Sequence, residues 1–318
     1  MRKVCYLHVG LHKTASTSFQ QTCANNADAL KQAGINYPIF ECEAANKLKI
    51  QNHSIPIFSL FVNNPADYHV NKRWGVSEQI DKVNSSYMEQ LERHLELSSN
   101  ILISGEDISM LGEQAIERLI QTVEKYGYEI KATALIRSPY SMTCSQLQET
   151  IKGGKYNNLI SLNDSVSSQE SIQINGRANV VKKLKSIFSK RITFSSYERA
   201  CSSQCGPVGY LLREYLNQDP KVYKYSRSND SYYNLTVRFQ NELNKINSTF
   251  TNKKVNPSHQ RLTPEMNQNL DFSGKFLLTE REYELIKDFI RDETNALYEL
   301  TMLDELVNQK IQFSKPIF

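Results

Sequence analysis

The residues from Gly10 to Ser18 combine a glycine, a lysine and a run of small hydroxylated side chains. Gly10 permits a tight turn and Lys13 supplies a cation. Helix N-termini present free N–H groups and the positive end of a dipole, which favours bound phosphate or sulfate. We therefore expect an anion-binding segment, here called the anion loop (residues 10–18), although an ordinary strand–helix turn with polar caps is the alternative. Its remaining small residues are Thr14, Ala15, Ser16, Thr17 and Ser18.

The anion loop differs from the usual loop of nucleoside-triphosphate-binding proteins. That loop reads Gly-x-x-x-x-Gly-Lys-Ser/Thr. Here only two residues separate Gly10 from Lys13, and the residue directly before the lysine is not a glycine. The segment is therefore P-loop-like without having the form that normally binds ATP or GTP.

A second pair of residues could bind an anion. Arg137 follows an apolar run, and Ser145 lies eight residues further, about two turns into the expected helix. A guanidinium can form bidentate hydrogen bonds to a terminal phosphate, and a hydroxyl can add another. An arginine at the end of a strand can equally be a salt-bridge partner, so this pair alone is a weak indication.

Apolar runs and helical patterns alternate along the chain, and together they must position these groups. This alternation predicts an α/β protein, a three-layer P-loop-like fold in which helices flank a central parallel sheet. Ligands of such sheets bind at the carboxyl ends of the strands, which points to residues 10–18, 105–107, 137–145 and 197–198. The expected strands are 4–9, 101–104, 130–136 and 192–195, and the expected helices are 16–32, 79–97, 114–126, 138–152, 175–188, 206–216, 235–246 and 280–300.

The length of 318 residues is compatible with one large domain. We expect a single domain over residues 1–318, with an excursion at about 36–78 and a C-terminal helical region from about residue 232. Hydrophobic residues make up 40% and charged residues 23%, so the chain can build a core. The net charge of +4 does not indicate a nucleic-acid partner and is compatible with a small anionic ligand.

The six cysteines are irregularly spaced and, with the histidines, form no pattern typical of a metal site, so no metal is expected. No apolar stretch approaches the roughly 20 residues of a transmembrane helix. No signal peptide is recognisable at the N-terminus. We therefore expect a cytoplasmic protein with reduced thiols.

Four segments, taken in order, resemble the motifs of sulfotransferases, especially bacterial members of the carbohydrate type. Residues 8–18 are similar to the loop that binds the 5′-phosphosulfate. Residues 135–145 are similar to the 3′-phosphate element, in which an arginine precedes a serine by eight positions. The softer matches are residues 194–198, where Tyr197 corresponds to a tyrosine beside the adenine, and an Asn-x-Ser loop formed by Arg227, Asn229 and Ser231.

This resemblance implies a reaction and roles for residues. The donor would be 3′-phosphoadenosine-5′-phosphosulfate (PAPS), the nucleotide product 3′-phosphoadenosine-5′-phosphate (PAP), and the acceptor a hydroxyl or amine of a glycan, glycolipid or related molecule. Lys13 would stabilise charge on the leaving nucleotide. A general base is needed, and Glu106, His12 and His53 are candidates in that order. Ala15 stands where the family usually has glycine, and residues 36–78 and 155–175 match no known element.

Two other functions remain open from the sequence. A P-loop kinase or nucleotide hydrolase would explain the strand–loop–lysine arrangement, but the second glycine is missing and only Asp107 could serve as an acidic magnesium ligand. A non-catalytic binding protein on the same fold would explain the unmatched excursion.

Overall fold

The computed structural model of the chain describes residues 2–159, 175–226, 231–251 and 262–314. The chain forms two compact units. Unit 1 consists of Met1–Ile136 and Asn179–Ser228, and unit 2 of Arg137–Ala178 and Asn229–Phe318. The single domain expected from the sequence stays a prediction, because two clusters of contacts can still belong to one folding domain.

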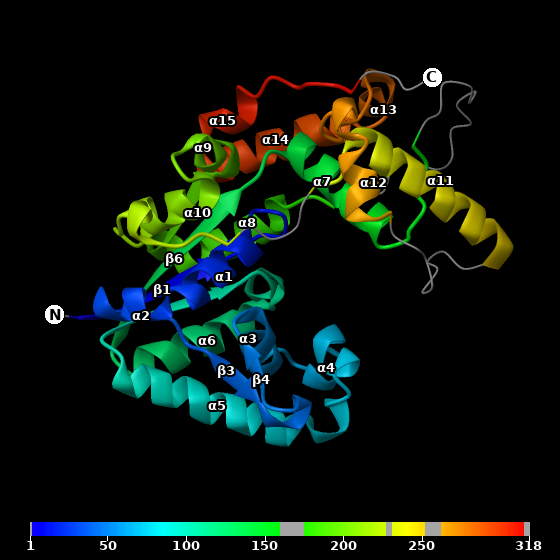
Figure 1. Ribbon diagram of the computed structural model, residues 1–318. Coiled ribbons are helices and arrows are strands. Elements are labelled where there is room, and N and C mark those ends of the chain that lie inside the picture. The colour runs from blue at the N-terminus through cyan, green and yellow to red at the C-terminus, as the bar shows by residue number, and fades with distance from the viewer. Residues whose placement is uncertain (1, 160–174, 227–230, 252–261, 315–318) are drawn as a thin grey trace. The chain divides into compact units, whose positions relative to one another are not determined.

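Unit 1 is built on a five-stranded parallel sheet (Figure 1). The strand order is β2-β5-β1-β6-β7, so β1 is central and pairs with β5 on one side and β6 on the other. The sequence predicts four of these strands, whereas β2 is only two residues long and too short to give a pattern. The strands are β1 (Lys3–Val9), β2 (Ile35–Asn36), β5 (Asn100–Gly105), β6 (Tyr128–Ile136) and β7 (Ile192–Ser196).

Helices cover both faces of this sheet. Leu102 and Leu135 pack with Phe19 of α1 and Leu211 in one core cluster. Strand residues of the opposite orientation, such as Leu7 of β1, are equally buried. These observations confirm the predicted α/β fold class with a parallel sheet flanked by helices. The helices with residues in unit 1 are α1 (Ser16–Asn25), α2 (Ala27–Gln32), α3 (Ser54–Phe61), α4 (His69–Arg73), α5 (Ile80–Leu97), α6 (Glu113–Lys125), α8 (Ala178–Phe188), α9 (Tyr197–Ser202), α10 (Gly206–Tyr210) and a π-helical turn (Leu211–Tyr215).

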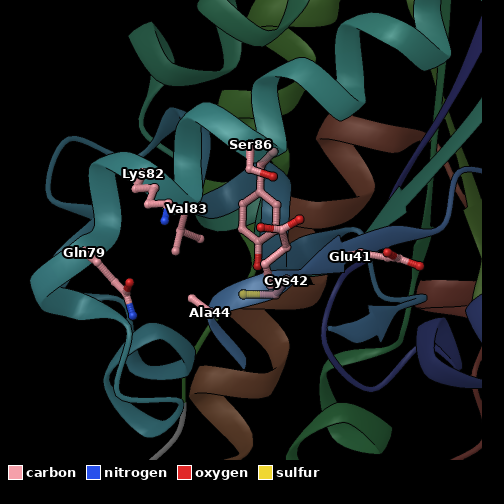
Figure 2. Close-up of a pocket in the computed structure, with 9 residues that line it drawn as sticks. Glu41, Cys42, Ala44, Gln79, Lys82, Val83 and Ser86 are labelled. Atoms are coloured by element: carbon pink, nitrogen blue, oxygen red, sulfur yellow. The ribbon is translucent and has the colours of Figure 1, made fainter. Parts of the chain in front are cut away.

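The excursion between β2 and α5 contains helices and an antiparallel hairpin. The hairpin pairs β3 (Phe40–Cys42) with β4 (Leu48–Ile50), and α3 packs against α5, α6 and β5. A pocket of about 240 Å³ opens between the hairpin and α5, and Figure 2 shows Cys42, Val83 and Ser86 around it. The sequence shows no clean period here because these elements are short.

A larger polar groove of about 960 Å³ lies at the amino end of the sheet, lined among others by Asn36, Arg93 and Asn100. Asn100 is the first residue of β5, whereas Glu106 directly follows its last residue. The groove is therefore at the opposite end of the strand from the edge where the sequence predicts the ligand.

Unit 2 is helical where the structure describes it. Its core contains Tyr140, Leu147, Phe276 and Ile290. Pro139 is the first residue of α7, a position that suits proline because proline lacks the N–H that a first helical turn leaves unpaired. The helices are α7 (Pro139–Lys152), α11 (Asn234–Thr251), α12 (Pro264–Gln268), α13 (Glu280–Glu284), α14 (Lys287–Thr301) and α15 (Asp304–Val307).

None of the helices in the described ranges has both the length and the apolar character that crossing a membrane requires.

Candidate functional site

The anion loop connects the central strand β1 to α1 through an unusual backbone. Lys13 has a φ of 70° and Ala15 a φ of 65°, both in the left-handed region that is unfavourable for residues with a Cβ. The N–H of Gly10 donates to the carbonyl of Gly105 over 3.2 Å, which joins the ends of β1 and β5. Two successive kinks within three residues turn the chain from the strand into the helix.

Gly10 is required by close packing rather than by its own backbone angle. A Cβ at this position would lie 2.3 Å from Ser16 Oγ and 3.3 Å from the Cα of Glu106. No side chain fits there without displacing the start of α1 or the end of β5. The glycine therefore lets three functional segments approach one another.

The hydroxyl groups of the anion loop differ in how they are paired. The Thr14 hydroxyl donates to the carbonyl of Leu11 and so braces the loop. Ser16 is 3% exposed, and its Oγ has no hydrogen-bond partner in the part of the chain that the structure describes. A buried hydroxyl without a partner is costly. Ser16 is also the first residue of α1, and the first turn of a helix presents N–H groups that can bind an anion.

Two carboxylates face the anion loop from the neighbouring strand. Because β5 is parallel to β1, Glu106 and Asp107 emerge at the same edge of the sheet as the loop. His12 lies between them, with Nδ1 3.6 Å from Glu106 Oε2 and Nε2 3.5 Å from Asp107 Oδ1. These distances are too long for good hydrogen bonds, so the interaction is mainly electrostatic. The structure thus brings together Lys13, His12 and Glu106, the candidate residues predicted from the sequence. Their two segments lie about ninety residues apart in the chain.

The environment of Glu106 favours its charged form. Burial by itself would raise the pKa of this carboxyl, but the opposing influence of His12, Lys13 and His8 is larger, and the net pKa is lowered. Glu106 is therefore ionised at neutral pH and can accept a proton. Its side chain is 25% exposed, so a substrate in solution can reach it.

Both ring nitrogens of His53 form hydrogen bonds within the fold. Its Nε2–H donates to the carbonyl of Pro38 over 2.6 Å, and its Nδ1 accepts from the N–H of Ser104 over 3.0 Å. Burial lowers the pKa of this histidine to about 4. Both ring nitrogens are occupied and the side chain is inaccessible, so we infer that His53 ties the excursion to β5, and Glu106 and His12 stay the candidates for a general base.

His8 is a buried polar residue that the sequence interpretation did not assign. Its Nδ1 lies 2.8 Å from Ser104 Oγ, and its ring packs edge-on against Phe19. Its Nε2 has no partner among the described residues. Burial lowers the pKa of His8 to about 4, although the Glu106 carboxylate opposes this, so the ring is neutral at physiological pH. Alternation along the chain puts His8 on the same face as Gly10, the first residue of the anion loop.

The turn that carries Glu106 and Asp107 is held by residues that no sequence pattern indicates. The hydroxyl of Ser54 accepts from the N–H of Asp107 over 3.1 Å, and Tyr68 donates to Asp107 Oδ2 over 2.6 Å. Lys183 donates to the carbonyls at the end of the same turn, which belong to Ser109 and Leu111. These contacts join residues 39 to 74 positions apart, so only the folded structure reveals them.

Arg137 and the helix that follows it belong to unit 2. Arg137 directly follows β6, and its Nε donates to Ser141 Oγ over 2.8 Å on the first turn of α7. Ser145 lies on the next turn and is partly exposed. Lys152, further along α7, lies 4.5 Å from the ring centre of Tyr232. The role of Arg137 and Ser145 in binding a 3′-phosphate stays a prediction.

The two weaker motif matches, residues 194–198 and the Asn-x-Ser loop, differ in how far the structure describes them. Tyr197 is the first residue of α9, immediately after β7, and packs partly buried against the core of unit 1. Ser231 is exposed, and its carbonyl accepts from Asn267. Arg227 and Asn229 lie outside the described residues.

Comparison with known proteins adds limited information. No family model matches the chain, and no curated protein sequence matches it. Among solved structures, the chain is similar to a sulfotransferase domain from the Synechococcus PCC 7002 olefin synthase, with a TM-score of 0.34, 12% identity and coverage of 90% of this chain and 94% of that one. It is also similar to a structure from the PezAT chromosomal toxin–antitoxin system of Streptococcus pneumoniae, with a TM-score of 0.34, 12% identity and coverage of 78% and 87%. At this level of similarity neither structure assigns a function to the chain.

Proposed function

We propose that this protein is a sulfotransferase that moves a sulfuryl group from PAPS to a hydroxyl or amine of an acceptor. The observation that carries the proposal is the anion loop, in which the cation of Lys13, the start of α1 and the Ser16 hydroxyl, unpaired within the described residues, meet at the carboxyl end of the central strand. The ionised carboxylate of Glu106 lies beside it. The anion loop thus offers groups that can bind an anion, and the turn after β5 offers a carboxylate that can act as a general base.

The residues of the anion loop fit the phosphosulfate part of the donor. Gly10 lets the Ser16 side chain lie directly against the loop backbone, and the buried Ser16 hydroxyl lacks a partner among the described residues. The hydroxyls of Thr17 and Ser18 and the N–H groups of the first turn of α1 would add further contacts. In the proposal, Arg137 and Ser145 bind the 3′-phosphate, which is what distinguishes this donor from other adenine nucleotides.

Glu106 and Lys13 would act at opposite ends of the reacting group. The S–O bond to the 5′-phosphate breaks while a new S–O bond forms to the acceptor oxygen. Glu106 accepts the proton that the acceptor hydroxyl loses. Lys13 stabilises the negative charge that develops on the phosphate oxygen left behind. His12, between the two carboxylates, holds Glu106 in place and is the alternative base.

The acceptor follows only from the resemblance of the motifs to the carbohydrate type. We propose a bacterial glycan, glycolipid precursor or related hydroxyl compound in the cytoplasm. Incubation of the protein with radiolabelled PAPS and an extract of its own cells, followed by identification of the labelled product, would name this acceptor and supply the substrate for rate measurements.

The direct test of the proposal is calorimetric titration with PAP and, separately, with AMP. These ligands differ in the 3′-phosphate. A charge-assisted hydrogen bond is worth about 1.5–3 kcal/mol, so PAP should bind at least about tenfold more tightly. Equal affinity for the two nucleotides would contradict the proposal.

A kinase or nucleotide hydrolase is the second candidate, favoured by one observation. Glu106 and Asp107 follow the strand next to β1, which is where P-loop nucleotidases carry their acidic magnesium ligand. Magnesium-dependent turnover of ATP, together with weak binding of PAP, would favour this candidate over the sulfotransferase.

A further inference from the structure

Tyr68 is a buried residue of the excursion that reaches the edge of the sheet where the anion loop lies. It is 6% exposed, and its ring stacks on Phe58 with 4.6 Å between the ring centres. Its hydroxyl donates to Asp107 Oδ2 over 2.6 Å. The other oxygen of this carboxylate, Oδ1, faces His12 Nε2 at 3.5 Å. A continuous chain of contacts therefore runs from the excursion to the anion loop.

The direction of the hydrogen bond in this chain is fixed by chemistry. A carboxylate only accepts, so the tyrosine must donate. Burial, followed by the charge of Asp107, raises the pKa of Tyr68 well above its ordinary value, so the donor is present at any working pH. The hydroxyl thereby fixes the rotation of the Asp107 carboxylate and points its second oxygen at the imidazole.

We propose that Tyr68 is a positioning residue: through Asp107 it holds His12 between two carboxylates, and so fixes His12 against Glu106 and beside Lys13. This inference rests on the proposed function, because it assigns Tyr68 to the reaction of that site. His12 immediately precedes Lys13, whose left-handed backbone needs support from its surroundings. The excursion, which the sequence could not match to any known element, would then help to organise the catalytic edge.

The contacts from Tyr68 through Asp107 to His12 predict that loss of the Tyr68 hydroxyl changes the pH dependence of the reaction as well as its rate. Without the Tyr68 hydroxyl, the Asp107 carboxylate is free to rotate or to attract His12 more strongly, and both changes weaken the contact of His12 with Glu106. The pKa of Glu106 then rises, and activity is lost at a higher pH on acidification. Among the described residues, the charged and titratable groups around Glu106 and Tyr68 are His12 and Lys13 of the anion loop, His8 of β1, Asp107, and His69 and Arg73 of α4; the ring centre of His69 lies 4.8 Å from that of Tyr68.

Tyr68→Phe removes only the hydroxyl, and Tyr128→Phe is its matched control. Tyr128 is 3% exposed, and its hydroxyl donates to the carbonyls of Leu95 and Ser98 over 3.0 and 2.7 Å, at the amino end of β6. Both variants lose one buried tyrosine donor in unit 1. With radiolabelled PAPS and the acceptor identified from the cell extract, Tyr68→Phe should lower kcat about tenfold, leave the KM for PAPS unchanged and shift the acid limb to higher pH. Tyr128→Phe should change none of these.

A second measurement makes the inference independent of the reaction. The ring-nitrogen NMR signals of His12, identified by their disappearance in His12→Asn, should move in Tyr68→Phe and stay in place in Tyr128→Phe. Sulfuryl transfer with unchanged His12 signals, or with wild-type kcat and pH profile in Tyr68→Phe, would overturn the role of Tyr68 alone. If the wild-type protein transfers no sulfuryl group, the proposed function is wrong. If the His12 signals still move in Tyr68→Phe, the contact from Tyr68 through Asp107 to His12 is confirmed, but it has no role in sulfuryl transfer.

Discussion

Two buried polar regions of this molecule differ in how completely their atoms are paired. On α11 of unit 2, Asn241 donates to the carbonyl of Asn157 and accepts from its N–H, and Asn244 donates to the carbonyls of Ile151 and Lys155. The oxygen of Asn244 accepts from Gln240. Every amide atom of these two α11 asparagines has a partner. This group, the α11 amide network, fixes the C-terminal end of α7.

The anion loop of unit 1 is different. Ser16 Oγ and the Nε2 of His8, both buried, have no hydrogen-bond partner in the described ranges. Left-handed backbone at Lys13 and Ala15 adds strain at the same place. Complete pairing is what a purely structural polar group needs, whereas unpaired groups and strain gather where a ligand completes the contacts. The comparison therefore contrasts a fully paired group of amides with a loop that combines buried groups lacking a described partner with left-handed backbone.

The largest expected effect comes from the cation of the anion loop. Lys13→Ala should lower the rate of sulfuryl transfer by roughly 10²–10³, because a preorganised charge at the leaving oxygen acts mainly in the transition state. The affinity for PAP should change little. Steady-state rates and calorimetric titration measure the two effects separately.

Arg137→Ala serves as the control for this experiment. In the proposed function it binds the 3′-phosphate in the ground state, so its loss should weaken PAP binding about tenfold or more and affect kcat less. If Lys13→Ala instead lost affinity and Arg137→Ala lost turnover, the roles of the two segments would have to be exchanged.

The comparison itself is tested by one substitution in each region. Asn244→Ala removes the hydrogen bonds that Asn244 makes to the carbonyls of Ile151 and Lys155 and to the side chain of Gln240. It should lower the free energy of unfolding by about 2–4 kcal/mol, without changing kcat of the folded protein. Ser16→Ala removes a hydroxyl that has no partner in the part of the chain that the structure describes. Stability should therefore stay within about 0.5 kcal/mol or rise, while PAP binds two- to tenfold more weakly. Denaturant unfolding and titration measure both. A large loss of stability in Ser16→Ala would mean that the anion loop is a structural element like the α11 amide network.

A smaller effect concerns the acid limb of the pH–rate profile. His12, together with Lys13 and His8, outweighs burial and lowers the pKa of Glu106, so the base stays charged to a pH below its ordinary range and activity is lost only as pH falls through that lowered pKa. In His12→Asn the pKa of Glu106 should rise, and activity should fall at a higher pH. The profile of kcat/KM records this shift. An acid limb that disappears altogether would identify His12 itself as the titrating base.

Much of the sheet and its edge could be predicted from the sequence, because both depend on local patterns. The strand at Lys3–Val9 is a mostly apolar run that ends directly before Gly10, and the strand at Asn100–Gly105 is one that ends directly before Glu106. The convergence of Lys13 and Glu106 then follows from the rule that parallel strands share a carboxyl edge. His12 lies between two carboxylates because of this same convergence.

Contacts distant in sequence account for what the sequence could not predict. Tyr68 approaches Asp107 only once the excursion has folded, and its sequence neighbours give no period. The helix expected over residues 16–32 is broken at Asn26. There the Asn26 side chain bonds to Thr22 within the helix and to the backbone of Lys224 far along the chain. A tertiary hydrogen bond thus overrides a helical pattern that is continuous in the sequence.

The smallest effect tests the strain in the anion loop directly. Ala15 has a φ of 65°, which glycine adopts at no steric cost and alanine does not. Ala15→Gly should therefore raise the free energy of unfolding by up to about 1 kcal/mol, even though glycine gains more freedom in the unfolded chain. The matched control is Ala24→Gly in the last turn of α1, where the backbone is helical and the same exchange should cost up to about 1 kcal/mol. Opposite signs for one substitution on either side of the start of α1 would establish that the loop stores backbone strain; equal losses would show that Ala15 is relaxed and that strain is no part of the difference between the anion loop and the α11 amide network.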